Sequence, residues 1–130
     1  MHVAFFLTPK EEIVWLESDF TVRQTMEKME YHRYSAIPII DDNGKYIGTI
    51  TEGDLLWKLK KSMDITFKET SNLLLKDVER HRDHKSISIN SQIEELKALA
   101  INQSFIPVVD DQGIFIGIIK RSTILQHFFK

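Results

Sequence analysis

The sequence has no cysteine among its 130 residues. Disulfide bridges, thiolate zinc sites, iron–sulfur clusters and cysteine nucleophiles are therefore excluded for this chain. Long hydrophobic runs are also missing: residues 114–119 form one of the longest, far short of the roughly 20 apolar residues that span a bilayer. Since no charged start followed by an apolar stretch marks a secretory signal either, we expect a cytoplasmic protein with no membrane partner.

A large excess of either charge is absent too. Lys and Arg number 17 and Asp and Glu number 19, so the formal net charge is −2. Because a surface built to coat nucleic acid is usually strongly basic, this balance argues against nucleic acid as a partner. With 42% hydrophobic residues, a chain of this length can form one compact domain with an ordinary core and no covalent cross-links.

What the chain does contain is an internal repeat. Residues 35–56 align without a gap to residues 104–125, and 10 of the 22 aligned positions are identical. The offset of 69 residues between the two copies indicates a duplicated unit of about 60 residues.

Each copy is predicted to contain a hairpin of two strands. In the first copy, residues 37–40 and 46–50 are apolar and β-branched, and Asp41-Asp42-Asn43-Gly44 separates them. Such a cluster favours a tight turn, because Asn and Gly accept the positive φ angles that it requires. Paired acids can also form a metal or acid/base site, but in a turn their oxygens more often accept local backbone N–H groups. The second copy repeats the pattern at Asp110-Asp111-Gln112-Gly113.

A helix is predicted before each hairpin and another after it. Thr21 with Gln24, and Ser91 with Glu94, have the spacing of a capping box, and apolar residues at helical spacing follow both. Short extended segments precede these helices, so each copy is expected to fold as β-α-β-β-α. We therefore predict an α/β fold of the α+β type. The extended segments are residues 13–16 and 86–89.

The stretch between the copies is rich in charge. Residues 58–85 hold eight Lys or Arg and five Asp or Glu but no Gly or Pro, which favours a packed connector over a flexible linker. Zinc or nickel ligation by His81 and His84 is one interpretation of this stretch. Without a cysteine or a third spaced ligand, a polar loop or a clamp on the phosphates of a ligand is favoured, and we predict no metal site. The predicted divisions are repeat 1 at residues 1–62, a connector at 63–75 and repeat 2 at 76–130.

The junction between the second strand of the first hairpin and the next helix allows two interpretations. A helix N-terminus carries unpaired N–H groups and a partial positive charge, which attract phosphate. Thr51 could donate its hydroxyl to a phosphate oxygen there, and Asp54 could accept both hydroxyls of a ribose. Thr51 and Asp54 also have the spacing of a capping box, in which the two side chains cap the helix. The spacing leaves both roles open.

The duplicated pattern, Ile-Pro-Ile-Ile-Asp-Asp-Asn-Gly-Lys-Tyr-Ile-Gly-Thr-Ile-Thr-Glu-Gly-Asp from Ile37 onward, closely resembles the cystathionine-β-synthase (CBS) domain. Two in tandem resemble a Bateman module, and Leu7-Thr8-Pro9 is similar to the start of such a domain. The resemblance covers nearly the whole chain. It implies two β-α-β-β-α repeats related by pseudo-two-fold symmetry, clefts that bind adenosine-containing ligands, and a disc-shaped homodimer that regulates a partner instead of catalysing a reaction.

The family's Gly-x-x-Ser/Thr-x-x-Asp motif for ribose and phosphate falls on Gly48, Thr51 and Asp54. Adenine in this family lies between strands, against apolar side chains and main-chain amides. The resemblance therefore implies a first ligand site made of Ile13, Val14, Ala36, Ile37, Pro38, Gly48, Thr51 and Asp54.

The second repeat departs from this motif, because its three columns hold Gly117, Lys120 and Thr123. Loss of the acid removes a charge-assisted hydrogen bond to ribose worth roughly 1.5–3 kcal/mol. Lys120 and Arg121 instead favour a ligand with more phosphate, and Phe105 either stacks on a base or fills the pocket. The implied second and weaker site consists of Ile87, Phe105, Ile106, Pro107, Lys120, Arg121 and Thr123.

Three classes of function follow from these features. The favoured one is a regulatory module that binds AMP, ADP, ATP, S-adenosylmethionine or cyclic di-AMP as its ligand, uses no catalytic cofactor, and signals to an unknown protein partner by a conformational change. The alternative is a structural dimerisation scaffold with no nucleotide bound, which the altered second motif favours and the intact first motif opposes. We expect no enzyme, because the sequence shows no nucleophile or acid/base pair with a supporting residue.

Overall fold

The computed structural model describes residues 2–62, 67–81 and 83–129. Contacts divide the chain into two compact units. Unit 1 comprises Met1–Val14, Asp42–Tyr46 and His84–Lys130, and unit 2 comprises Trp15–Asp41 and Ile47–Asp83. Unit 1 therefore combines most of the second repeat with the N-terminal segment and the hairpin turn of the first.

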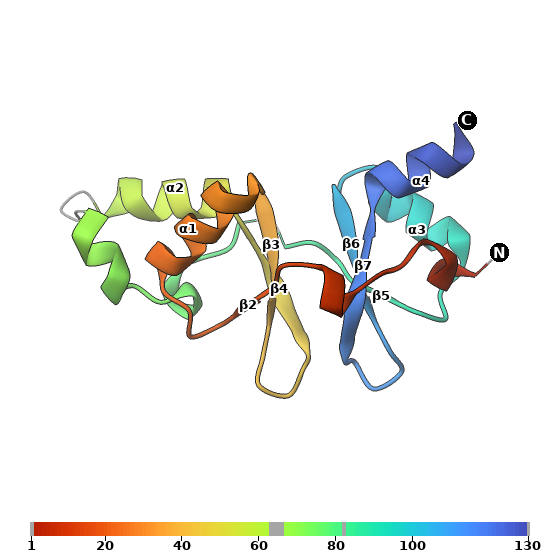
Figure 1. Ribbon diagram of the computed structural model, residues 1–130, viewed down its shortest axis with the longest axis horizontal. Coiled ribbons are helices and arrows are strands. Elements are labelled where there is room, and N and C mark those ends of the chain that lie inside the picture. The colour runs from red at the N-terminus through yellow and green to blue at the C-terminus, as the bar shows by residue number, and fades with distance from the viewer. Residues whose placement is uncertain (1, 63–66, 82, 130) are drawn as a thin grey trace. The chain divides into compact units, whose positions relative to one another are not determined.

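Unit 2 contains a three-stranded sheet with helices on one side of it (Figure 1). Its elements are β2 (Leu16–Glu17), α1 (Val22–His32), β3 (Ala36–Ile40), β4 (Tyr46–Thr51, of which Tyr46 belongs to unit 1) and α2 (Glu52–Lys61). The strand order is β2-β3-β4, and β2 runs parallel to β3. The strands contribute fully buried isoleucine side chains to the core of this unit, and their burial stabilises the sheet that ends in α2.

Residues 67–75 belong to the same unit and are bonded to it, as the lack of Gly and Pro predicted. Two short 3₁₀ helices, η3 (Phe67–Asn72) and η4 (Leu75–Asp77), follow there. The carbonyl of Leu73 accepts the N–H of Val22 at 2.7 Å, and the N–H of Leu75 donates to the carbonyl of Phe20 at 2.8 Å. Residues 63–66 of the predicted connector lie outside the described residues.

Unit 1 is built on a four-stranded sheet in the order β1-β7-β6-β5. Its elements are η1 (Val3–Phe6), β1 (Thr8–Pro9), η2 (Lys10–Glu12), β5 (Ile87–Ser88), α3 (Ile93–Ala100), β6 (Phe105–Val109), β7 (Phe115–Lys120) and α4 (Arg121–Phe128). One core cluster joins η1, the sheet and both helices, and it includes Phe6, Leu96, Ile106 and Ile124.

The pairing of β1 with β7 was not predicted from the sequence. The two strands are antiparallel, with Thr8 opposite Ile118 and Pro9 opposite Gly117. A Cβ at Gly117 would overlap the carbonyl oxygen of Thr8, so the close approach of this strand requires a glycine.

The predicted β-α-β-β-α order is confirmed in both copies, and so are the turns of the hairpins. Gly44 and Gly113 have φ angles of 81° and 82°, the positive values that the turn sequences predicted. In the second turn, one carboxylate oxygen of Asp110 accepts the N–H groups of Gln112 and Ile114, each at 2.9 Å. This acid therefore stabilises the turn, as expected.

One of the two predicted helix caps is confirmed and the other is wrong. Thr21 and Gln24 form the reciprocal capping box at the start of α1. The N-cap of α3 is Gln92, which makes no side-chain cap hydrogen bond. Ser91 lies one residue before it, and its N–H donates to the carbonyl of Ser88. Among the residues that the structure describes, no helix combines the length and the apolar character needed to cross a membrane.

The predicted extended segment at residues 13–16 is also displaced. The strand is Leu16–Glu17, because Leu16 and Glu17 pair in parallel with Ile39 and Ile40 of β3. Ile13 instead is the C-cap of η2. The second predicted segment, residues 86–89, contains the strand β5 as expected.

Candidate functional site

The junction of β4 and α2 is closed by a reciprocal pair of hydrogen bonds. The N–H of Asp54 donates to the hydroxyl oxygen of Thr51 at 3.1 Å, and the N–H of Thr51 donates to Oδ2 of Asp54 at 3.0 Å. This is the capping box that the sequence allowed, and it fixes both side chains at the first turn of α2. The structure therefore confirms the capping role.

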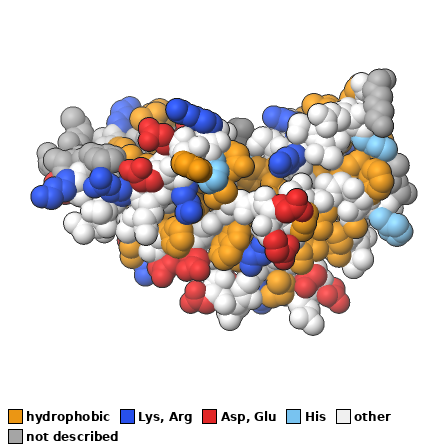
Figure 2. All heavy atoms as spheres, in the orientation of Figure 1, with side chains coloured by type: hydrophobic (Ala, Val, Ile, Leu, Met, Phe, Trp, Pro, Cys, Tyr) orange, Lys and Arg blue, Asp and Glu red, His pale blue; other side chains and the backbone are white. Residues whose placement is uncertain are grey.

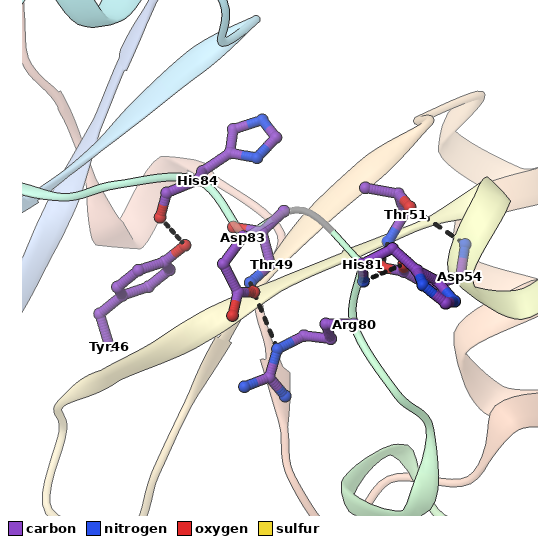
Figure 3. A network of polar contacts seen from close by, with 8 residues as sticks. All are labelled: Tyr46, Thr49, Thr51, Asp54, Arg80, His81, Asp83 and His84. Carbon is purple, nitrogen blue, oxygen red and sulfur yellow. Dashed lines mark hydrogen bonds and ion pairs between the residues drawn. The ribbon is translucent and has the colours of Figure 1, made fainter.

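Asp54 has a second role that its local spacing does not reveal. Its other oxygen, Oδ1, accepts the backbone N–H of His81 at 2.9 Å (Figure 3). Both carboxylate oxygens thus accept backbone N–H groups, and only 2% of the residue is exposed. A buried carboxylate requires such partners, because an unsatisfied charge is costly away from water.

The segment around His81 also binds to β4. Oδ1 of Asp83 accepts the N–H of Thr49 at 2.9 Å and the Nε–H of Arg80 at 2.8 Å. Gly48 allows this approach, since a Cβ there would lie 2.6 Å from both Nε of Arg80 and Oδ1 of Asp83. Figure 3 shows Arg80 and Asp83 beside this strand.

Six of the eight residues implied for the first site lie in unit 2. Gly48, Thr51 and Asp54 occupy the end of β4 and the start of α2, and Ala36, Ile37 and Pro38 form the start of β3, the neighbouring strand. The N–H of Glu52 donates to the carbonyl of Ser35 at 3.0 Å and holds the junction to the chain just before β3. Ile13 and Val14 belong to unit 1 and are half-buried.

All seven residues implied for the second site lie in unit 1. Phe105 pairs with Lys120 across β6 and β7, Ile106 pairs with Ile119, and Pro107 with Ile118. Ile87 is in β5, and Arg121 and Thr123 are in the first turn of α4. The N–H of Arg121 donates to the carbonyl of Ser104 at 2.9 Å, which repeats the bond between Glu52 and Ser35 in the first copy.

The two junctions differ in how their helices are capped. Lys120 is the N-cap of α4 and makes no side-chain cap hydrogen bond, whereas Thr51 and Asp54 form a full box at α2. The Lys120 side chain is exposed, and the Arg121 guanidinium donates through Nη1 to the carbonyl of Ala100 at 3.2 Å. The second junction therefore presents a cation where the first has a hydroxyl.

Phe105 is packed inside unit 1. Its exposed fraction is 7%, and its ring stacks on the imidazole of His84 with centroids 4.5 Å apart. Stacking on a base and filling of the pocket both stay predictions for this residue. The carbonyl of His84 accepts the hydroxyl of Tyr46 at 2.6 Å.

The sequence did not identify the residues that contact β4 from the segment around His81. Thr49 and Asp83 are separated by 34 residues, so no spacing rule connects them. From the sequence, this segment was interpreted only as a weak candidate for a metal site, as a polar loop or as a clamp on the phosphates of a ligand. Arg82 lies outside the described residues, and the residues that the structure does describe contain no group of three or more His, Cys, Asp or Glu able to hold a metal ion.

Comparison with known proteins reveals the same duplication. A family model described as the CBS domain matches residues 6–61 and again residues 75–130. Among curated proteins, the inosine-5'-monophosphate dehydrogenase of Methanocaldococcus jannaschii is 27% identical over 120 residues. That match covers 89% of this chain and 22% of the enzyme, so the chain spans about a fifth of that relative's length.

Solved structures share the fold over nearly the whole chain. A structure of CbpB in complex with c-di-AMP has a TM-score of 0.86 and 24% identity, and the match covers 98% of this chain and 83% of that one. A structure of CBSX2 in complex with AMP has a TM-score of 0.76 and 22% identity, covering 97% of this chain and 94% of that one.

Proposed function

Because the chain belongs to the CBS-domain family and carries two such domains in tandem, we propose that it is a regulatory module that binds an adenosine-containing nucleotide. The observation that carries the proposal is the set Gly48, Thr51 and Asp54 at a strand-to-helix junction. The fold is shared with CbpB and CBSX2, whose structures hold c-di-AMP and AMP. Candidate ligands are AMP, ADP, ATP, S-adenosylmethionine and cyclic di-AMP.

In the proposed first site, Asp54 binds the ribose. Its Oδ1 would exchange the N–H of His81 for a ribose hydroxyl, while Oδ2 keeps the capping bond to Thr51. The N-terminus of α2 and the Thr51 hydroxyl would favour the phosphate. The adenine would lie against Ala36, Ile37 and Pro38 of β3.

The proposed second site takes a ligand with more phosphate, or takes the same ligand more weakly. Thr123 offers no carboxylate for ribose, whereas Lys120 is exposed and cationic at the start of α4. The packing of Phe105 on His84 supports the weaker binding, because a base would have to compete with that ring contact. Replacing Thr123 by Asp would restore the acid, and we expect it to increase adenosine affinity at this site.

Signalling would proceed by a shift of population. A ligand that binds one conformation more tightly than another increases the fraction of that conformation, to which a protein partner can bind.

We propose that the module works in the cytoplasm as a homodimer and catalyses no reaction. Hydrophobic side chains at the surface support association: Ile101, Leu125, Phe128 and Phe129 line a groove of about 490 Å³ on α3 and α4. Figure 2 shows further hydrophobic side chains at the surface among charged ones.

A structural scaffold without nucleotide is the alternative, and one observation favours it. Asp54 is buried, and both of its oxygens are already satisfied by backbone N–H groups. In a scaffold, Asp54 would serve only to accept these two hydrogen bonds and so stabilise the fold. In a sensor, the ligand would replace one of them.

Thermal unfolding with a panel of nucleotides distinguishes the two functions. The panel is AMP, ADP, ATP, NAD, S-adenosylmethionine, cyclic di-AMP and GTP. A ligand at a hundred times its Kd stabilises the folded state by about 2.7 kcal/mol, a rise in Tm on the order of 10 °C for this length. Such a rise with one adenine ligand supports the sensor, and no rise with any of them supports the scaffold.

Calorimetric titration of variants then tests the site. Asp54→Asn keeps the shape of the side chain but loses its charge and one acceptor, so we expect at least about tenfold weaker binding of the active nucleotide. Glu52→Gln is the matched control, because Glu52 is an exposed acid in the same helical turn and has no side-chain role in the cap. Equal affinity in Asp54→Asn and Glu52→Gln would remove Asp54 from the site.

A further inference from the structure

The carboxylate of Asp83 occupies a position with the features of an anion site. It accepts one hydrogen bond from the backbone N–H of Thr49 on β4 and a second from the guanidinium of Arg80, at 2.9 and 2.8 Å. A backbone N–H and a guanidinium on one oxygen are the donors that proteins also use for phosphate.

Arg80 and Asp83 pack closely against β4. Gly48 precedes Thr49, and any larger residue would place a Cβ 2.6 Å from Nε of Arg80 and Oδ1 of Asp83. The Arg80 side chain is only 23% exposed, so its charge lies against the strand, whereas the Asp83 side chain is 44% exposed. The acid can therefore leave for water more easily than the guanidinium can.

We propose that Thr49 and Arg80 form an anion site for a phosphate group and that Asp83 is its internal competitor. For its natural ligand this inference rests on the proposed function, because Thr49 lies two residues before Thr51 on the strand that leads into α2. A phosphate at this position would displace the Asp83 carboxylate and accept the same N–H groups. Asp83 would then set the threshold of the sensor by lowering its affinity for phosphate.

Inorganic pyrophosphate is the probe, because it contains phosphate without adenosine. Asp83→Ala should bind pyrophosphate roughly tenfold more tightly than the unmodified chain, the effect on affinity of one charge-assisted hydrogen bond. Adding Arg80→Ala to this variant should abolish the gain. Calorimetry at low salt measures both affinities, and circular dichroism checks that each variant is folded.

Two controls separate a site from a general effect of charge. Glu79→Ala removes an exposed acid of the same segment, whose carboxylate lies 3.7 Å from the amine of Lys61. Lys76→Ala removes an exposed cation from the same part of the chain. Asp83→Ala must gain more pyrophosphate affinity than Glu79→Ala does. Arg80→Ala must lose more pyrophosphate affinity than Lys76→Ala does. Equal changes would overturn the inference.

Where Asp83→Ala fails to fold, Asp83→Asn replaces it. The amide oxygen still accepts the N–H of Thr49 but no longer carries charge, so a smaller gain in pyrophosphate affinity is expected. Affinity equal to that of the unmodified chain would overturn the inference.

Titration with AMP separates the two proposals. If the unmodified chain binds AMP but Asp83→Ala shows no gain with pyrophosphate, the anion site is wrong and the proposed function stands. If Asp83→Ala gains affinity for pyrophosphate while neither protein binds any adenine nucleotide of the panel, the anion site stands and the proposed function is wrong.

Discussion

Replacing Asp54 by Ala should destabilise the protein even without a ligand. The buried carboxylate accepts the N–H of Thr51 at 3.0 Å and that of His81 at 2.9 Å. Each hydrogen bond to a charged acceptor contributes roughly 1.5–3 kcal/mol, and loss of a helix cap alone typically costs about 1 kcal/mol. His81 is an exposed residue, and a water molecule that replaced the carboxylate as acceptor of its N–H would reduce the cost. We therefore expect a loss of about 2–4 kcal/mol in the free energy of unfolding.

Urea and thermal unfolding measure this loss. For a chain of this length, about 3 kcal/mol corresponds to a decrease in Tm on the order of 10 °C. The midpoint in urea should fall while the m-value stays constant, because the surface exposed on unfolding hardly changes. Hydrogen exchange adds a local readout: the amide of His81 should exchange faster in the variant than in the unmodified chain.

Glu52→Ala is the control for this prediction. Glu52 is exposed in the first turn of α2, so its removal loses only an interaction with the helix dipole, about 0.3–1 kcal/mol. If Asp54→Ala and Glu52→Ala lowered stability equally, the two hydrogen bonds of Asp54 would contribute nothing, and the argument from burial would be refuted.

Three further predictions concern the fold. Gly117→Ala should severely destabilise the protein or prevent folding, because its Cβ would overlap the Thr8 carbonyl. Gly53→Ala should stabilise α2 by about 0.5–1 kcal/mol, because its Cβ would meet its nearest atom at 3.7 Å. Urea unfolding compares the two variants. Thr21→Ala should cost about 1 kcal/mol through loss of its cap, and a similar loss of thermal stability in Ser91→Ala would contradict the assignment of caps. Gln103→Leu should cost about 2 kcal/mol or more, because the Gln103 amide bonds the backbone at Lys85 and Phe105; an unchanged urea midpoint would refute this.

Much of the fold could be predicted because its signals are local. The two hairpin turns follow from glycines that adopt positive φ, and the box at Thr21 follows from spacing within one helical turn. The duplication made these signals stronger, since each appears twice. The limit of local signals is equally clear at Ser91, where the spacing of a cap is present but the helix begins one residue too late to use it.

The candidate site was only partly visible in the sequence. Thr51 and Asp54 were identified because a capping box and a ribose-phosphate motif both place them at the start of a helix. Asp54 also accepts the N–H of His81, which is 27 residues away, and no sequence pattern indicates this bond. The same is true of Asp83, whose carboxylate reaches Thr49.

By itself, the sequence determined the repeat, the order of elements, and the residue types at each strand-to-helix junction. These follow from spacing, turn chemistry and helix capping, which act within a few residues. Only the tertiary structure decided that β1 joins the sheet beside β7, that Phe105 packs on His84, and that Asp83 accepts the N–H of Thr49 on β4. Those contacts join distant residues, because buried polar groups must find partners and apolar rings must find cover wherever the folded chain provides them.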